Sequence, residues 1–194
     1  MQHRTLTVAW VVGIGLIALG IIACRQASPA LPSPTASLQL RSPAFAANAS
    51  LPMEATCDGA DRSPALAWSD PPAGTQAFAL LVDDPDAPNG VFTHWILFNI
   101  PATSRSLPAG LPADAVLPDG SRQGKNDFGH LGYNGPCPPP GPAHHYRFTL
   151  WALDQPLDLQ PGADRAAFLA AVQRHALASG QLVGLYQRQR ARVS

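Results

Sequence analysis

Residues 91–100 read VFTHWILFNI, and this stretch decides the fold class. It is rich in β-branched and aromatic residues and stops at Pro101, which is the pattern of a core β-strand. Two similar stretches, AFALLVD at residues 77–83 and HHYRFTLWAL at residues 144–153, predict two more core strands. The centre of the domain is therefore expected to be a β-sheet.

Turns rich in proline and glycine separate these strands, and one helical pattern follows them. The chain contains 21 Pro and 16 Gly, which argues against a helical bundle because proline disrupts helix interiors. A helix is expected over residues 163–179, with Asp164 in its first turn and Gly180 ending it. Its apolar residues recur at helical spacing: Phe168, Leu169, Val172 and Ala176. The stretch QLVGLYQ at residues 181–187 then predicts a last strand.

The order of these elements predicts the architecture. Shorter candidate strands at residues 38–41 and 65–68 add to the three core strands. Many strands, long proline loops and one late α-helix are typical of an antiparallel β-sandwich with Greek-key-like connections.

The N-terminus has the layout of a secretory signal. Residues 5–23 carry no charge and follow His3 and Arg4, and the run closes with Ile21-Ile22-Ala23-Cys24, which resembles a bacterial lipobox. We therefore expect a lipoprotein signal peptide over residues 1–23 with lipidation of Cys24, placing the protein in the cell envelope, outside the cytoplasm. The alternative is a single N-terminal transmembrane anchor, since nineteen residues at about 1.5 Å each span roughly 28 Å.

The rest of the chain divides into three parts. Residues 24–37 are rich in Pro and Ser and are expected to form an extended tether. The folded domain is expected over residues 38–188, with a short tail at 189–194. Cys57 and Cys137 lie inside the domain, and outside the cytoplasm they form either a disulfide or two buried free thiols.

Composition excludes some classes of function. Basic and acidic residues balance at 13 each, so no positive field is available for nucleic acids. Hydrophobic residues make up 46% of the chain, which disfavours disorder.

Polar residues interrupt the apolar faces of the three core strands near one end. Strict alternation places His94 on one face with Phe92, Ile96 and Phe98. In the same way, His144 and Tyr146 share a face that continues in two apolar residues, Phe148 and Leu150. Asp84 shares a strand face with Leu80 and Val82 and lies at the end of that face. If the strands are neighbours, Asp84, His94, His144 and Tyr146 converge in a pocket with an apolar wall.

These residues lie within two ordered sets of motifs. The sets are Asp84-Pro-Asp-Ala-Pro88 with His94-Trp95 and Asn99-Ile-Pro101, and Gly135-Pro-Cys-Pro-Pro139 with His144-His-Tyr146. They resemble the two signatures of the phosphatidylethanolamine-binding protein (PEBP) family. The stretches TCDGADRSPALAW, GKNDFGHLGYNG and LVGLYQR are similar to its bacterial Raf-kinase-inhibitor-like branch, the YbhB/YbcL type.

The resemblance implies a two-sheet fold and a small pocket for anions such as phosphate or phospholipid head groups. By motif position its ligand-binding residues are Asp84, Asp86, His94, Gly135, Pro136, His144 and Tyr146. Members act more as binders and modulators of kinases or proteases than as catalysts, so no enzyme activity or cofactor is expected. Many members have Arg where this chain has His145. Imidazoles near neutral pH are suited to donate hydrogen bonds to an anion.

Three alternatives remain at this point. Cys137 and His144 could form the thiol–imidazole pair of a hydrolase, although no Gly-x-Ser-x-Gly motif occurs. Asp84, His94 and His144 have side chains that suit zinc, although no close His/Cys spacing supports a metal site. The third alternative is a structural domain with a vestigial pocket.

Overall fold

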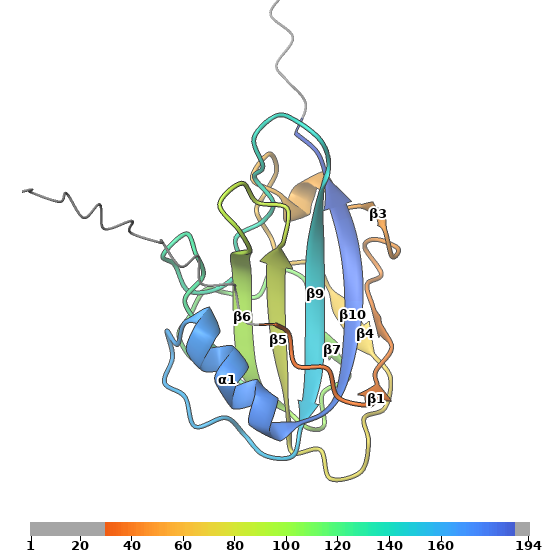
Figure 1. Cartoon of the computed structure of the whole chain (residues 1–194), viewed down its shortest axis with the longest axis vertical. Coiled ribbons are helices and arrows are strands. Elements are labelled where there is room, and N and C mark those ends of the chain that lie inside the picture. Colours follow the sequence, from red (N-terminus) through yellow and green to blue (C-terminus); the bar gives the residue numbers. More distant parts are fainter. Residues whose placement is uncertain (1–29, 189–194) are drawn as a thin grey trace, which may run out of the picture.

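The computed structural model describes residues 30–188, which form two β-sheets and one α-helix (Figure 1). The central strands of the larger sheet lie in the order β10 (Ala176–Tyr186), β9 (His144–Leu153), β5 (Ala77–Asp84) and β6 (Phe92–Pro101). Its shorter strands are β1 (Ala36–Ser37), β3 (Ala49–Ser50) and β8 (Arg122–Gln123). The smaller sheet consists of β2 (Leu40–Arg41), β4 (Leu66–Trp68) and β7 (Ser106–Leu107). A 3₁₀ turn, η1, covers Met53–Ala55.

The arrangement confirms the predicted β-sandwich with one late helix. The chain leaves the β5–β6 hairpin, passes through β8, and returns as β9 on the other side of β5, which is a Greek-key-like connection. One feature differs from a purely antiparallel sheet, because β1 and β3 both pair in parallel with β10.

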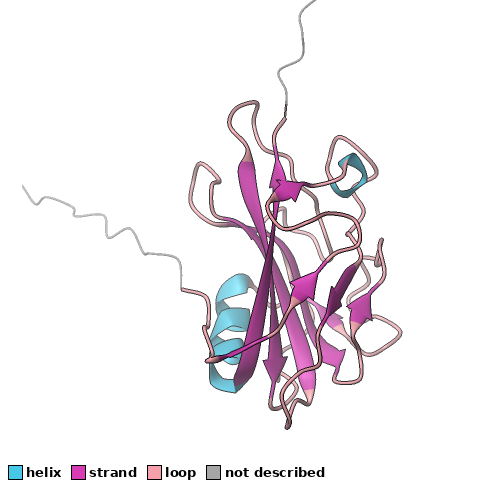
Figure 2. Cartoon of the chain, turned by 90° about the vertical axis from the view of Figure 1, so that its right-hand side faces the viewer, coloured by secondary structure: helices cyan, strands magenta, loops and turns pink. Residues whose placement is uncertain are grey.

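The larger sheet is buried on both faces, as Figure 2 shows with α1 (Arg165–His175) on one side and the smaller sheet on the other. Leu80 and Val82 of β5 face the smaller sheet, whereas Ala79 and Leu81 face the helix. Every residue of β5 is buried. This double burial explains why the strand reads as a continuous apolar run rather than as an alternating one.

The helix α1 ends earlier than the sequence predicts. Asp164 caps it from outside the first turn, because its side chain accepts a hydrogen bond from the Ala167 amide at 2.8 Å. Residues 176–179, predicted as helix, instead begin β10 directly after His175. Their backbone is satisfied by pairing with β9 and by the Leu38 amide, which donates to the Ser179 carbonyl. Tertiary pairing therefore overrides the helical spacing of Ala176.

The prediction that Gly180 ends the helix is wrong. Gly180 lies inside β10, opposite Leu150. A Cβ at this position would collide with the backbone carbonyl of Leu38. The glycine is needed because the chain that follows β1 passes directly over β10.

The packed part of the chain begins before Leu38, where the sequence places the start of the domain. Leu31 packs against the helix-side core, and the Pro32 carbonyl accepts a hydrogen bond from the Trp151 indole at 2.9 Å. Of the predicted tether, residues 31–37 are thus held against the large sheet. The predicted signal peptide, Cys24 and the tail at 189–194 lie outside the described residues. None of the helices within residues 30–188 has the length and apolar character needed to cross a membrane.

The close contact at Gly180 predicts a specific loss of stability. Gly180→Ala is expected to lower the free energy of unfolding by about 1–3 kcal/mol, because the added methyl group must displace backbone rather than a side chain. Gly141→Ala is the control, since the nearest atom lies 3.8 Å from a Cβ placed there. Urea unfolding of both variants measures the difference, and equal stabilities would contradict the packing argument.

Candidate functional site

A pocket of about 260 Å³ opens at the end of the sandwich where β5 stops and where β6 and β9 begin. The loop between β5 and β6 and the proline-rich loop before β9 both lie at the top of Figure 1 and contribute to its wall. Four of the residues singled out from the sequence line this pocket: Asp84, His94, His144 and Tyr146.

The other three residues predicted to bind the ligand, Asp86, Gly135 and Pro136, do not line the pocket. The Gly135 amide donates to Asp61 Oδ1 at 2.6 Å, and the Pro136 carbonyl accepts from the Cys57 amide at 3.1 Å. Asp86 lies at the exposed rim and pairs with His145. Gly135 and Pro136 therefore support the wall, and their polar groups serve the fold.

His94 reaches the pocket because β6 contains a β-bulge. Val82 pairs with Trp95 and the next residue, Asp83, pairs with Thr93, so His94 is an extra residue between them. The bulge breaks the strict alternation. The predicted shared face of His94 with Ile96 and Phe98 is therefore wrong, because these two residues pack on the helix side. The His94 ring instead lies 5.2 Å from the Tyr146 ring, on the side of the smaller sheet.

The hydrogen bonding of His94 determines its protonation. Its Nδ1 lies 2.7 Å from the Asn134 carbonyl oxygen, which can only accept, so Nδ1 carries the proton. Burial lowers the pKa of the His94 ring, and the opposing effects of Asn134 and Asp84 only partly offset this. The ring is therefore neutral at neutral pH, with a lone pair on Nε2. This differs from the expectation that the pocket imidazoles donate hydrogen bonds to an anion, because Nε2 of the neutral His94 ring can only accept one.

His144 is oriented by Asp84. The His144 Nδ1 lies 2.7 Å from Asp84 Oδ2, and the side chains are only 11% and 5% exposed. The other carboxylate oxygen accepts a hydrogen bond from the Asp86 amide at 2.8 Å. Both oxygens of Asp84 are thus occupied, and the free nitrogen of His144 is Nε2. When the ring is protonated, this nitrogen is a charged donor.

The Tyr146 hydroxyl is the third polar group of the pocket. It is buried and has no hydrogen-bond partner of good geometry among residues 30–188. Burial and the adjacent Asp84 carboxylate raise the pKa of the Tyr146 phenol, so the hydroxyl keeps its proton throughout the physiological range. It is therefore available as a neutral donor to a bound group.

Asp86 and His145 form a second acid–imidazole pair outside the pocket. Asp86 Oδ2 lies 2.7 Å from the His145 Nδ1 and 2.8 Å from the His145 amide nitrogen. Partial burial acts to raise the pKa of Asp86, but these hydrogen bonds outweigh it and lower the pKa. Both side chains are more than one-third exposed, so the pair is a feature of the rim.

The sequence predicted an apolar wall for the pocket but did not identify Phe128 as part of it. Phe92 and Phe128 contact each other edge to face at 4.8 Å, and the Phe128 ring lies 5.4 Å from His94. Phe128 stands on a loop whose shape is set by Asn126, which donates to the Asn134 side-chain oxygen at 2.8 Å. The available signal was an aromatic residue within the glycine-rich stretch GKNDFGHLGYNG. The remaining wall residues are Ala87, Pro88, Asn89, Gly90, Val91, Cys137, Pro138 and Pro139.

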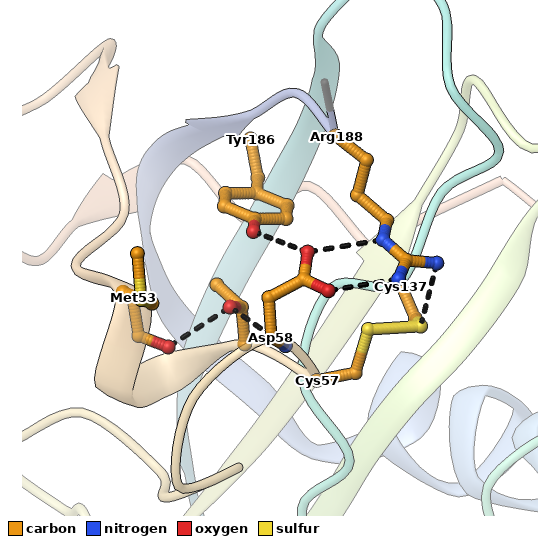
Figure 3. Close-up of polar contacts among 7 residues, drawn as sticks. Met53, Cys57, Asp58, Cys137, Tyr186 and Arg188 are labelled. Carbon is orange, nitrogen blue, oxygen red and sulfur yellow. Dashed lines mark hydrogen bonds and ion pairs between the residues drawn. A yellow bond between two sulfur atoms is a disulfide. The ribbon is translucent and has the colours of Figure 1, made fainter. Parts of the chain in front are cut away.

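A disulfide and an ion pair fasten the proline-rich loop behind the pocket (Figure 3). Cys137, which lines the pocket, is bonded to Cys57. Next to it, Asp58 accepts hydrogen bonds from Arg188 at 2.8 and 3.0 Å and from Tyr186 at 2.6 Å. The hydrogen bonds from Tyr186 and Arg188 lower the pKa of Asp58. This cluster joins the pocket wall to the end of β10.

The structure bears on two alternatives drawn from the sequence. Cys137 has no free thiol because it is bonded to Cys57, so a Cys137–His144 hydrolase lacks its nucleophile. Within residues 30–188 there is also no group of three or more His, Cys, Asp or Glu residues that could hold a metal ion.

Comparison with known proteins gives consistent matches over the folded part of the chain. A sequence profile of the family described as phosphatidylethanolamine-binding protein matches residues 41–187. A UPF0098 protein of Methanothermobacter thermautotrophicus is 48% identical over 151 residues, which cover 78% of this chain and 99% of the relative. The UPF0098 protein YbhB of Escherichia coli is 44% identical over 132 residues, covering 66% and 84% of the two chains.

Two further comparisons concern location and fold. The protein of Mycobacterium tuberculosis named "Putative lipoprotein LppC" is 42% identical over 158 residues, covering 80% of this chain and 76% of the relative. The crystal structure of Escherichia coli YbcL, described as a new member of the mammalian PEBP family, superposes with a TM-score of 0.75 at 35% identity. The match covers 79% of this chain and 100% of YbcL.

The disulfide predicts a large contribution to stability. Replacing both cysteines by serine is expected to lower the free energy of unfolding by about 4 kcal/mol, because the bond closes a long loop in the unfolded chain. Guanidinium unfolding of the wild type and the Cys57→Ser/Cys137→Ser variant measures the loss. A thiol count on denatured, non-reduced protein checks the premise, and two free thiols at these positions would refute it.

Proposed function

Because the chain belongs to the phosphatidylethanolamine-binding protein family, we propose that it is a non-catalytic binding protein for a small anion such as a phosphate or carboxylate group. The observation that carries the proposal is that two polar groups lining the same cavity, His144 Nε2 and the Tyr146 hydroxyl, have no hydrogen-bond partner of good geometry among the described residues. Aromatic and proline side chains around them would cover an apolar part of the ligand.

The charge of the pocket supports a modest affinity. Its described lining includes no Lys or Arg, and it contains the carboxylate of Asp84. An anion would therefore be held by hydrogen bonds rather than by a net positive field. Such a site is expected to bind in the micromolar to millimolar range.

We further propose that the protein is a lipoprotein outside the cytoplasm. The lipobox-like Ile21-Ile22-Ala23-Cys24, the name of the LppC relative and the disulfide all support this location. Only six residues separate Cys24 from Leu31, where packing begins. At about 3.3–3.6 Å per residue, the seven steps from Cys24 to Leu31 would hold the domain within roughly 25 Å of the membrane surface. Modulation of a kinase or protease stays a prediction of the family resemblance.

Removing His144 is expected to weaken anion binding without unfolding the protein. His144→Ala should raise the Kd for inorganic phosphate about 10- to 100-fold, the range for one hydrogen bond to a charged group. Calorimetric titration of the full-length protein with inorganic phosphate measures the change in Kd.

The matched control is His175→Ala. His175 also bonds an aspartate through Nδ1, at 2.9 Å from Asp154, but it lies at the far end of α1 from the pocket. This variant should bind phosphate like the wild type. Absence of binding to the wild type at millimolar phosphate, or equal binding by His144→Ala, would refute the proposal.

Lipidation can be tested separately at Cys24. Mass spectrometry of the mature N-terminus from a bacterial host is expected to find a diacylglyceryl group on Cys24 and no residues before it. Cys24→Ser should remove the lipid because serine lacks the thiol that accepts it. A serine variant that is processed and lipidated like the wild type would exclude the lipoprotein assignment.

A further inference from the structure

The chain contains two Asn-Gly dipeptides, Asn89-Gly90 and Asn134-Gly135, and the fold treats them differently. Asparagine is chemically labile, most of all before glycine, because a residue without a Cβ does not obstruct attack by its nitrogen on the asparagine side chain. In a folded protein the reaction requires a free asparagine side chain and a free backbone nitrogen after it. It also requires that this nitrogen can lose its proton.

Asn89 is free to react at the rim of the pocket. It lies in the loop between β5 and β6 (Figure 1), where Asn89 and Gly90 are both exposed and line the pocket. The Asn89 side chain makes no hydrogen bond within the described range 30–188. The Gly90 amide donates only to the neutral Ala87 carbonyl, at 3.1 Å, which closes a turn in the same loop. Such a bond opens by a local fluctuation that leaves the core intact.

Asn134 is held on both sides of the reacting bond. Its side-chain oxygen accepts from Asn126 at 2.8 Å, and its side-chain nitrogen donates to Asp61 Oδ2 at 3.2 Å. The buried Gly135 amide donates to the other oxygen of the same carboxylate at 2.6 Å. A negative charge at this place opposes loss of the proton, because a deprotonated amide is itself an anion. The fold therefore protects Asn134.

We infer that Asn89 is a site of spontaneous deamidation, and that this modification adds a negative charge to the rim of the pocket. The Gly90 nitrogen attacks the side-chain carbonyl carbon of Asn89, and a succinimide ring closes. The side-chain nitrogen leaves as ammonia and carries away the proton of the Gly90 amide. Water then opens the ring at either carbonyl, giving aspartate or isoaspartate. The net reaction consumes a water molecule and needs no oxidant, reductant or enzyme.

The new carboxylate acts on the site described above. The described lining of the pocket contains Asp84 but no Lys or Arg, so no fixed positive charge compensates a carboxylate at residue 89. It repels an anion held by His144 and Tyr146, and isoaspartate also lengthens the main chain in this loop. The effect on affinity rests on the anion-binding function proposed above, whereas the modification itself does not.

The modification is measurable without any ligand. Full-length protein is incubated at mildly alkaline pH, which favours loss of the Gly90 amide proton, and its peptides are analysed by mass spectrometry that distinguishes aspartate from isoaspartate. Asn89 should convert at least about ten-fold faster than Asn134, because only Asn134 must first break contacts of the core. In urea-unfolded protein the two rates should be similar. Equal rates in the folded protein would overturn the inference.

The substitution Asp61→Asn tests the protection of Asn134. It replaces the carboxylate by a neutral amide, and asparagine tolerates the left-handed backbone of residue 61, where φ is 53°. Conversion of Asn134 should rise at least about three-fold, while Asn89 reacts as in the wild type. Asp70→Asn is the matched control, since Asp70 pairs with Arg105 and with neither dipeptide. An unchanged Asn134 rate would refute the protection, and if the variant does not fold, the folded and unfolded wild type decide it.

A charge variant tests the consequence for the pocket. Asn89→Asp should raise the Kd for inorganic phosphate about two- to five-fold at low salt, because like charges in exposed surroundings repel weakly. Asn48→Asp is the matched control, since Asn48 is exposed, has a φ of 59° and lies outside the pocket lining. Its Kd should equal that of the wild type. Calorimetric titration measures all three proteins.

Incubation links the two measurements. The wild type should lose phosphate affinity in step with conversion of Asn89. Asn89→Gln should keep its own starting affinity over the same time, because glutamine forms the corresponding larger ring far more slowly. A wild-type affinity that stays constant while Asn89 converts would refute the effect on the pocket.

The outcomes separate this inference from the proposed function. If the wild type binds no phosphate, the anion-binding function fails, and mass spectrometry still decides whether Asn89 is modified. If phosphate binds and Asn89→Asp binds it equally well, the modification stands and its effect on the pocket is refuted. If Asn89 stays intact while Asn134 reacts, the inference fails and the anion-binding function is unaffected.

Discussion

The reciprocal pair of hydrogen bonds between His94 and Asn134 is the contact on which the site depends. It joins a bulge in a buried strand to a long loop forty residues further along the chain. The contact fixes the ring's tautomer and its direction, and it holds the loop that carries Phe128 over the pocket. Burial lowers the pKa of the ring even though this contact acts to raise it, and the neutral ring leaves Nε2 with a lone pair.

The alternation of β5 separates the site from a structural ion cluster. Asp84 faces the pocket, while the preceding residue, Asp83, faces the helix side and lies 3.0 Å from Arg165 and 3.4 Å from Arg147. Burial raises the pKa of Asp83 even though both arginines act against it. Two adjacent carboxylates thus serve different purposes because successive residues of a strand point to opposite faces.

The pocket combines rigid walls with few charges. The disulfide and the Asp58–Arg188 pair hold one wall, and the prolines next to Cys137 leave few backbone donors there. The polar groups left in the pocket are the imidazole nitrogens and the phenol, whose donor and acceptor roles are set by their hydrogen-bond partners.

The sequence by itself determined the strands, the sandwich and the convergence of Asp84, His144 and Tyr146, because each depends on the local pattern and on strand alternation. It could not locate the end of the helix or the role of Gly180, since both follow from β10 pairing with β9 and from the close approach of Leu38. The face of His94 and its proton were likewise decided only by the tertiary structure. A bulge shifts the alternation without a local signal, and the acceptor that fixes the tautomer comes from a distant loop.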